Sequence, residues 1–231
     1  MDEGGSARRK GGYRRGDDSR QRIVEAALDV FGHAGYDGAT TRTLAAAAGV
    51  NLAAIGYYFG GKEGLYRAVA EHIVAEIAAR QAPMVARVHA ALGTGEPSGD
   101  AARTLLLDVL DSLAAMLIGS AEAERWARFV IREQMDPSPA FDVIYDGFMR
   151  GLHGLCCRLV GRLRGRPADD AEVVIVTTTL FGQILVFRAA RATAQRALGW
   201  TAYTPERTAA IRAVIRRQVA AILDSQAEAT S

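Results

Sequence analysis

GVNLAAIGYYFGGKEGLY, residues 49–66, encloses a short apolar segment between glycines at both ends. Asn51 can cap a helix at this point, because its side-chain oxygen can accept the free N–H groups of the first turn. Glycines that follow such a segment readily adopt the left-handed conformation that ends a helix. The stretch therefore predicts a helix over residues 52–59 and a new helix that begins at Lys62.

A second short helix is predicted immediately upstream. Thr40 can cap it, Leu44 and Ala48 give it an apolar face, and Gly49 ends it after about two turns. Two short helices joined by a tight turn that contains glycine are the signature of a helix-turn-helix.

Two longer helices flank this pair. The first is expected to begin near Asp17 or Asp18, whose carboxylates suit a helix N-terminus, and to end at Gly35. Its apolar stripe consists of Ile23, Val24, Ala27, Leu28 and Phe31. The helix that begins at Lys62 is expected to bury Leu65, Val69, Ile73 and Ile77.

Loops divide the rest of the chain into further helices. Composition predicts them at ALGTGEPSGDA (91–101), DPSP (136–139) and RGRPADD (164–170). Between these loops, helices are expected around Leu105 to Met116, around Trp126 to Val130, and from Phe141 to about Arg164. Thr204 and Pro205 are expected as the N-cap and first residue of a last helix.

The segment from Val173 to Phe187 is ambiguous. Its residues VVIVTTT favour a strand by intrinsic preference. No turn signal interrupts the chain from Asp169 to about Leu198, however, and no partner strand is evident elsewhere. We therefore expect one long helix here and an all-α protein.

These elements predict a modular organisation. Residues 1–16 are rich in glycine and arginine and are expected to be a flexible basic arm. Residues 17–65 are expected to form a three-helix DNA-binding domain of the helix-turn-helix kind. Residues 66–226 are expected to form a larger helical bundle for ligand binding and dimerisation.

The composition restricts the class of protein further. The 231 residues are 49% hydrophobic and carry a formal net charge of only +2, so any nucleic-acid surface must be local. The two adjacent cysteines cannot build a disulfide framework, which favours a reducing compartment. The N-terminus lacks the apolar region of a signal peptide, and residues 173–187 fall short of the ~20 apolar residues of a membrane span. We expect a cytoplasmic protein with no membrane partner.

The helix over residues 52–59 has two unlike faces. Ile55 and Phe59 are expected to pack inward, whereas Ala53, Ala54 and Tyr57 point outward. Small outward side chains let a helix enter a major groove about 12 Å wide. A phenol such as that of Tyr57 is suited to phosphate oxygens, and a lysine in the first turn of the next helix adds to an anion site.

Two of these assignments have structural alternatives. Tyr58 lies near the inward face, so it can equally be a core aromatic residue. Lys62 can be a solvated surface lysine rather than a phosphate contact.

The stretch TTRTLAAAAGVNLAAIGYYFGGKEGLYRAV, residues 40–69, resembles the DNA-binding domain of TetR-type (tetracycline-repressor-like) transcriptional regulators. WARFVIREQMDPSPAFDVIYDGFM, residues 126–149, is similar to the branch with a CecR-type C-terminal domain. The resemblance implies a homodimer, a double-stranded DNA operator with two-fold symmetry, and a C-terminal pocket whose ligand usually releases DNA. It also implies a four-helix dimer interface built from the last two helices of each subunit, here near Asp170–Leu198 and Pro205–Asp224.

The resemblance assigns roles to individual residues. Thr41 matches a phosphate contact, and Arg42 matches a position that can reach a guanine edge. Base-facing positions match Leu52, Ala53 and Ala54. Tyr57 and Lys62 match phosphate contacts, and we also count Asn51 and Tyr58 among the candidate DNA-binding residues.

This chain departs from the pattern in one respect. Many members carry tyrosine where it has Gly56, and polar residues where it has Leu52 and Ala54. Direct hydrogen bonding from this helix to bases must therefore be poor. We expect specificity to depend on Arg42, Asn51, apolar contact with thymine methyl groups, and the arm. The arm can enter a minor groove through Arg8, Arg9, Lys10, Arg14 and Arg15, or be a solubilising tail.

Large side chains of the C-terminal half can line a small-molecule pocket or form core. The candidates are Met116, Trp126, Phe129, Phe141, Tyr145, Met149 and Phe181. His153 and Cys157 lie four residues apart, but no nearby residues complete a metal site, so we expect no metal and no cofactor. The absence of a catalytic triad, a phosphate loop or a carboxylate cluster predicts that the protein is not an enzyme.

The sequence thus predicts a homodimeric repressor that a small-molecule effector releases from a palindromic operator. The alternative is a small-molecule-binding or interaction protein with weak or non-specific DNA binding, which the sparse polar content of the helix over residues 52–59 favours.

Overall fold

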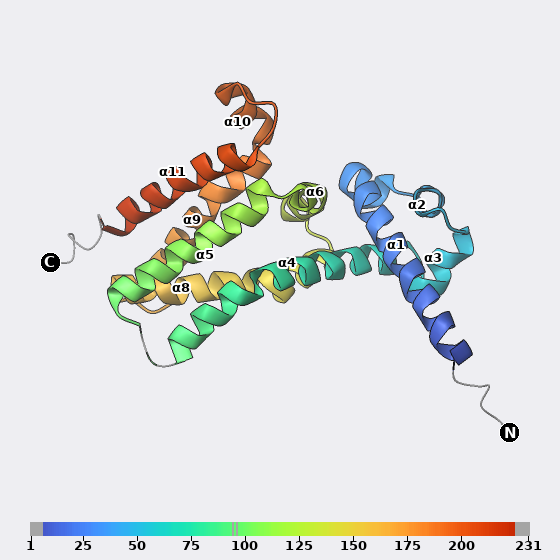
Figure 1. Ribbon diagram of the computed structural model, residues 1–231, viewed down its shortest axis with the longest axis horizontal. Coiled ribbons are helices and arrows are strands. Elements are labelled where there is room, and N and C mark those ends of the chain that lie inside the picture. The colour runs from blue at the N-terminus through green and yellow to red at the C-terminus, as the bar shows by residue number, and fades with distance from the viewer. Residues whose placement is uncertain (1–6, 94, 96, 225–231) are drawn as a thin grey trace. The chain divides into compact units, whose positions relative to one another are not determined.

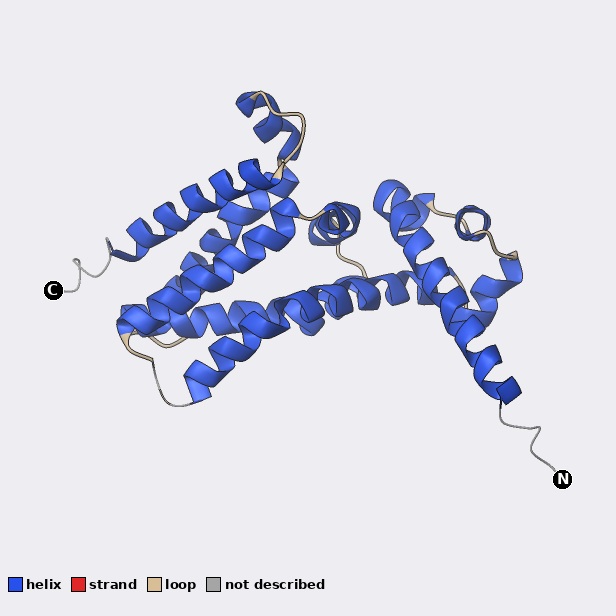
Figure 2. Cartoon of the chain, viewed as in Figure 1, coloured by secondary structure: helices blue, strands red, loops and turns tan. Residues whose placement is uncertain are grey.

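The computed structural model describes residues 7–93, 95 and 97–224, and no strand occurs among them (Figures 1 and 2). The chain divides into two compact units. The N-terminal unit comprises Met1–Val74 and Arg128–Ile144, and the C-terminal unit comprises Ala75–Ala127 and Tyr145–Ser231. The all-α fold predicted from the sequence is therefore confirmed over the described residues.

The N-terminal unit begins with α1 (Ala7–Gly38), followed by α2 (Thr41–Ala48) and α3 (Leu52–Phe59). It also contains the first turns of α4 (Lys62–Gly93), the end of α6 (Ala121–Met135), and α7 (Pro139–Ile144). The three apolar stripes expected on α1, α2 and α4 meet in its core, where Phe31, Leu44, Ile55 and Leu65 are fully buried. Each such side chain contributes about 1.5–3 kcal/mol relative to an exposed one.

The expected caps of the two short helices are present. The Thr40 hydroxyl accepts the N–H of Thr43 at 3.1 Å, and Gly49 ends α2 in the left-handed region at φ 62°. The Asn51 side chain accepts the N–H of Ala53 at 3.0 Å, and Gly60 ends α3 at φ 74°. These local bonds fix where α2 and α3 begin and end, as predicted.

The first helix differs from expectation at its start. It begins at Ala7, before the start expected near Asp17, so the part of the expected arm that the structure describes continues α1. Gly35, where we expected the helix to end, instead interrupts α1 with φ 72°, and the helix continues to Gly38. This positive φ favours glycine, and a Cβ atom there would lie 2.7 Å from Nη1 of Arg132, whose side chain would have to shift.

The C-terminal unit is built around α5 (Gly99–Gly119), which contacts α8, α9 and α11 (Figure 1). Val109, Leu110 and Leu113 are among its buried side chains. The surrounding elements are a π-helical turn (Tyr145–Met149), α8 (Arg150–Arg164), α9 (Ala171–Ala189), α10 (Arg191–Leu198) and α11 (Pro205–Asp224). The remainder of α4 and the start of α6 also belong to this unit.

Two helices expected to be continuous are divided. The helix expected from Phe141 to Arg164 is split into α7, the π-helical turn and α8. At the turn, Arg150 bonds Asp146 at 2.6 Å and its guanidinium lies 5.1 Å from the centre of the Tyr145 ring.

The helix expected from Asp169 to Leu198 ends at Ala189, and α10 begins at Arg191. Arg188 donates to the main-chain oxygens of Leu117, Ile118 and Ser120 at the end of α5. Arg191 pairs instead with Glu124 of α6. These long-range contacts lie on either side of the break at Ala190. No pattern in the sequence predicted them.

The ambiguous segment is helical, as we expected, but most of α9 is not buried. One stripe, Val173, Thr177, Leu180 and Ile184, packs into the unit. Ile175 is 61% exposed, and Val174, Leu185 and Val186 are exposed as well. By length and composition alone α9 is apolar enough to cross a membrane, contrary to our expectation, which counted its threonines and Gln183 as interruptions. Exposed apolar side chains gathered on one helix are typical of a surface that binds a partner.

Candidate nucleic-acid interface

The outward face of α3 is exposed as the sequence suggested. Ile55 is 1% exposed, whereas Leu52 is 53% and Tyr57 is 83% exposed. Ala53 is exposed as well, and Ala54 is half-buried. The face consists of methyl and isobutyl groups and one phenol, so it can approach another surface closely but offers few hydrogen bonds.

Tyr58 supports Tyr57 in the structure. It is half-buried, and the Tyr57 ring meets it edge to face with centroids 5.0 Å apart. Phe59, which we expected to be a buried anchor beside Ile55, is only half-buried. The guanidinium of Arg20 lies 5.2 Å from the centre of the Phe59 ring. Arg20 is thereby placed beside the end of α3, a neighbour that the sequence pattern did not indicate.

Arg42 and Thr41 occupy the first turn of α2. Arg42 is exposed and Thr41 is half-buried. The side-chain oxygen of Asn51 is already used as a helix cap, so only its amide N–H groups remain for a base edge. The predicted roles of these three residues in DNA contact remain predictions.

Lys62 has a structural role that sequence reasoning missed. Its ammonium donates to the main-chain oxygens of Tyr36 at 2.8 Å and Ala39 at 3.0 Å, and it lies 4.1 Å from the centre of the Tyr36 ring. It thus fastens the start of α4 to the end of α1. Two of its three N–H donors are occupied, which leaves one for a phosphate.

A buried polar cluster lies in the same unit. The Tyr66 hydroxyl donates to Oε1 of Glu133 at 2.5 Å, and the hydroxyl and N–H of Ser138 donate to Oε2 at 2.8 and 3.1 Å. Glu133 is only 2% exposed. Burial and the bond to Glu133 raise the pKa of Tyr66. The Tyr66 ring also packs against Phe31 and Phe129, with centroids 4.7 and 4.6 Å apart.

The side chains of the predicted basic arm (Arg8, Arg9, Lys10, Arg14 and Arg15) lie outside the described residues. Their contact with DNA stays a prediction.

The seven residues expected to line a ligand pocket are divided between the two units. Phe129 and Phe141 belong to the N-terminal unit, where Phe129 is part of the core. In the C-terminal unit Met116 is buried, and its sulfur accepts the amide of Gln81 at 3.4 Å. The remaining residues there are Trp126, Tyr145, Met149 and Phe181.

Trp126 is unusual among these candidates. It is 4% exposed, and its indole N–H is buried with no hydrogen-bond partner among the described residues. A buried donor without an acceptor costs about 1–3 kcal/mol.

The histidine and cysteine pair on α8 forms a local contact. Thr178 donates its hydroxyl to the Val174 oxygen, so it accepts from Nε2 of His153 at 3.1 Å. Nδ1 of His153 then accepts the thiol of Cys157 at 3.4 Å. The described residues contain no group of three His, Cys, Asp or Glu that could hold a metal ion. Burial raises the pKa of the neighbouring Cys156 to about 12.

Two capped short helices joined by a tight glycine turn, with the second presenting a bare outer face, define a helix-turn-helix protein of the DNA-binding class. Residues 23–69 match the family described as bacterial regulatory proteins, tetR family. Residues 102–225 match the C-terminal domain of the HTH-type transcriptional dual regulator CecR. The chain belongs to the TetR family, in the branch with a CecR C-terminal domain, and is a DNA-binding transcriptional regulator of a non-enzymatic family.

Similar proteins agree with this assignment. The dual regulator CecR of Shigella flexneri is 32% identical over 209 residues, which cover 90% of this chain and 93% of that protein. The crystal structure of the hemolysin II regulator HlyIIR has a TM-score of 0.57 at 18% identity and covers 86% of this chain and 97% of its own. The crystal structure of FadR of Bacillus subtilis in complex with stearoyl-CoA has a TM-score of 0.56 at 15% identity. It covers 86% of this chain and 96% of its own. The two structural likenesses establish the fold alone.

Proposed function

We propose that the protein is a homodimeric repressor that binds a palindromic operator in the cytoplasm and is released by a small-molecule effector. The exposed outer face of α3, with Tyr57 83% exposed at its end, carries this proposal. A slim helix enters the major groove, and donors at its flanks bind the phosphates. Tyr57 and Thr41 supply hydroxyl groups, and Lys62 supplies its remaining N–H.

We expect sequence preference in this arrangement to depend on Arg42, with Asn51, thymine methyl contacts and the arm, because the outer face of α3 has no side-chain donors before Tyr57. We expect Arg42→Ala to lower operator affinity by about 1–3 kcal/mol and to reduce the difference between operator and scrambled DNA. Tyr57→Phe, which removes only a phosphate donor, should weaken both DNAs alike. Fluorescence anisotropy titrations of each variant against both DNAs measure the two effects. An unchanged sequence preference in Arg42→Ala would reject Arg42 as the base contact.

Dimerisation is supported by the exposed apolar side chains of the last helices. They are Val174, Ile175, Leu185 and Val186 of α9, Leu198 of α10 and Val214 of α11. Pairing of α9 and α11 across a two-fold axis would bury them. A two-fold dimer that reads successive major grooves presents its two reading helices about one duplex turn, ~34–36 Å, apart.

Ile175→Glu tests the interface. A carboxylate at this position would be buried without a partner in the dimer, so the dimer dissociation constant should rise at least about a hundredfold. Sedimentation velocity across a concentration series measures it. Met135→Glu is the matched control, because Met135 is 82% exposed but lies on α6 in the N-terminal unit, and it should leave the dimer intact. An Ile175→Glu variant that stays dimeric at the wild-type concentration rejects α9 as the interface.

The unpartnered indole N–H of Trp126 supports the proposal that the protein binds an effector. A ligand with an acceptor atom near this indole would bond its buried N–H. The ligand would then stabilise the protein conformation in which it fits beside Trp126. An effector that lowers DNA affinity must have its own affinity lowered by DNA to the same extent.

The alternative, a small-molecule-binding or interaction protein with weak DNA binding, is favoured by the lack of polar side chains at Leu52, Ala53 and Ala54. A salt titration separates the two. A protein that makes several phosphate contacts loses affinity steeply as salt is added. The logarithm of its binding constant falls with the logarithm of the salt concentration, at a slope of roughly −0.9 per phosphate contact. Affinity for scrambled DNA equal to that for the operator at every salt concentration, or no measurable binding to either, would support the alternative.

A further inference from the structure

The apolar stripe of α1 continues to a charged residue at the edge of the N-terminal core. Ile23, Val24 and Ala27 of this stripe are fully buried. Arg20 comes three residues before Ile23 and four before Val24, so helical periodicity places it on the same face of α1. Unlike them, it is exposed. The core-facing stripe of α1 therefore passes at Arg20 from apolar side chains to a cation in contact with solvent.

The guanidinium of Arg20 lies beside the last side chain of α3. Its central carbon is 5.2 Å from the centre of the Phe59 ring. The centre of the Phe59 ring is 6.3 Å from that of Tyr58, and the Tyr58 ring meets the Tyr57 ring edge to face at 5.0 Å. Arg20 is thereby placed at the same end of α3 as Tyr57, the phenol that is exposed for phosphate contact.

The contact with Phe59 positions the cation without using its hydrogen-bond donors. The attraction between a cation and an aromatic ring acts between the charge and the ring, so it uses none of the five N–H groups of an arginine. Lys62, three residues after Phe59, differs in this respect. Two of its three N–H donors already bond the main chain of Tyr36 and Ala39.

The surface that follows the Phe59 ring along the chain is open. Gly60 and Gly61 form the turn after α3, and a Cβ atom at either position would meet nothing within 4 Å. Both residues have positive φ, 74° and 135°, a conformation that glycine adopts readily. A phosphate group can therefore approach this end of α3 without displacing a side chain of the turn.

We infer that Arg20 binds a backbone phosphate of duplex DNA at the C-terminal end of α3, and that Phe59 positions it there. The inference rests on the DNA binding through α3 that is proposed above. A helix in the major groove has a sugar-phosphate strand at each edge, and Tyr57 and Arg20 would bind the strand at this end. A guanidinium binds phosphate oxygens through paired hydrogen bonds, and such a contact carries no sequence information.

A salt titration of binding to duplex DNA of random sequence tests the inference. The probe is a fluorescein-labelled duplex, and the fluorescence anisotropy is followed with the full-length protein between about 50 and 200 mM potassium chloride. Arg20→Gln should bind at least about threefold more weakly at the lowest salt concentration. The logarithm of its binding constant should also fall less steeply with the logarithm of the salt concentration, by about 0.9 in slope for each protomer bound.

The slope separates a phosphate contact from a purely structural role. An arginine that only fastened α1 to α3 would change thermal unfolding, followed by circular dichroism, and leave the slope at the wild-type value. Arg20→Lys keeps the charge without the planar fork, so it should keep most of the slope and lose part of the affinity.

Phe59 is tested as the positioning residue. Phe59→Leu removes the ring and should weaken DNA binding less than Arg20→Gln does. The double variant should bind DNA as Arg20→Gln does, because Phe59 then has no cation to position. Losses of DNA affinity that simply add in the double variant would reject the positioning role of Phe59.

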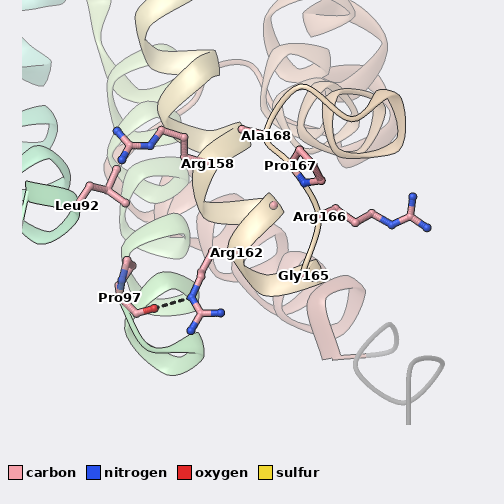
Figure 3. A pocket seen from close by; sticks show the side chains of 9 residues that line it. Leu92, Pro97, Arg158, Arg162, Gly165, Arg166, Pro167 and Ala168 are labelled. Carbon is pink, nitrogen blue, oxygen red and sulfur yellow. Dashed lines mark hydrogen bonds between the residues drawn. The ribbon is translucent and has the colours of Figure 1, made fainter. Parts of the chain in front are cut away.

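Two control variants remove the same charge elsewhere. Arg22→Gln acts on the same helix, where Arg22 is exposed but two residues from Arg20 and so on another face. Arg166→Gln acts in the C-terminal unit, where this side chain points away from a pocket of about 440 Å³ (Figure 3) and pairs with Asp170 and Glu172, each at 3.3 Å. Both controls should keep the wild-type slope and stay within about twofold of its affinity.

Three outcomes overturn the inference. An unchanged slope in Arg20→Gln, or equal losses in Arg20→Gln and Arg22→Gln, rejects Arg20 as a phosphate contact and leaves the proposed repressor function standing. A wild-type protein that binds no duplex at any of these salt concentrations overturns the proposed repressor function as well.

Discussion

Gly64→Ala should unfold the helix-turn-helix or lower the free energy of unfolding by about 3 kcal/mol. A Cβ atom at Gly64 would lie 1.8 Å from the main-chain oxygen of Phe59 and 3.0 Å from its carbonyl carbon. Both atoms belong to the backbone at the end of α3, so they cannot rotate away as a side chain would. The clash must separate α3 from α4 or distort the glycine turn between them.

Urea unfolding followed by circular dichroism measures the loss. Gly56→Ala is the matched control, since a Cβ atom there meets nothing within 4 Å. In a helix interior this change should be neutral or stabilise by up to about 1 kcal/mol. If Gly64→Ala unfolds at the same urea concentration as the wild type, the close contact between Gly64 of α4 and the Phe59 carbonyl is incorrect.

The same control variant also probes DNA binding. Gly56 borders the outer face of α3, so an added methyl group there should reduce operator affinity while the free protein remains stable. Loss of stability and loss of DNA binding are thereby separated within one pair of glycine substitutions.

The second large effect is expected at the buried carboxylate of Glu133. Three donors, from Tyr66 and Ser138, converge on a side chain that is 2% exposed. Hydrogen bonds to charged groups contribute about 1.5–3 kcal/mol each, so Tyr66→Phe should cost about that much. Glu133→Ala, which deprives all three donors of their acceptor, should cost roughly 3 kcal/mol or more.

A double-mutant cycle isolates the interaction free energy between Tyr66 and Glu133. Tyr66→Phe combined with Glu133→Ala should destabilise by less than the sum of the single changes, with a coupling of about 0.5–3 kcal/mol. Urea unfolding of the four proteins supplies the values. Strict additivity would show that the bond between the phenol and the carboxylate contributes nothing to stability.

The raised pKa of Tyr66 adds a pH dependence, caused first by burial and then by the bond to Glu133. The unfolded phenol ionises near its ordinary pKa of about 10, whereas the folded phenol stays protonated to higher pH. The resulting stability is therefore fully present below about pH 10 and is lost as pH rises through the folded pKa. Wild type should lose more stability than Tyr66→Phe between about pH 9 and 11.

Local features of the sequence determined the helix-turn-helix. The caps at Thr40 and Asn51 and the stops at Gly49 and Gly60 each involve bonds within a few residues, so the residue types alone predict them. The same is true of the buried stripe that includes Phe31 and of the exposed face that includes Tyr57, because helical periodicity assigns each residue to a face.

The tertiary structure alone decided the features that join distant segments. Lys62 bonds the main chain at Tyr36, Glu133 accepts from Tyr66, and Arg188 binds the end of α5 beside the break at Ala190. A composition pattern cannot indicate such pairs, because each side chain also fits an exposed helix surface. Which pairs meet depends on how the helices pack, and packing energy is a property of the assembled unit rather than of any short segment.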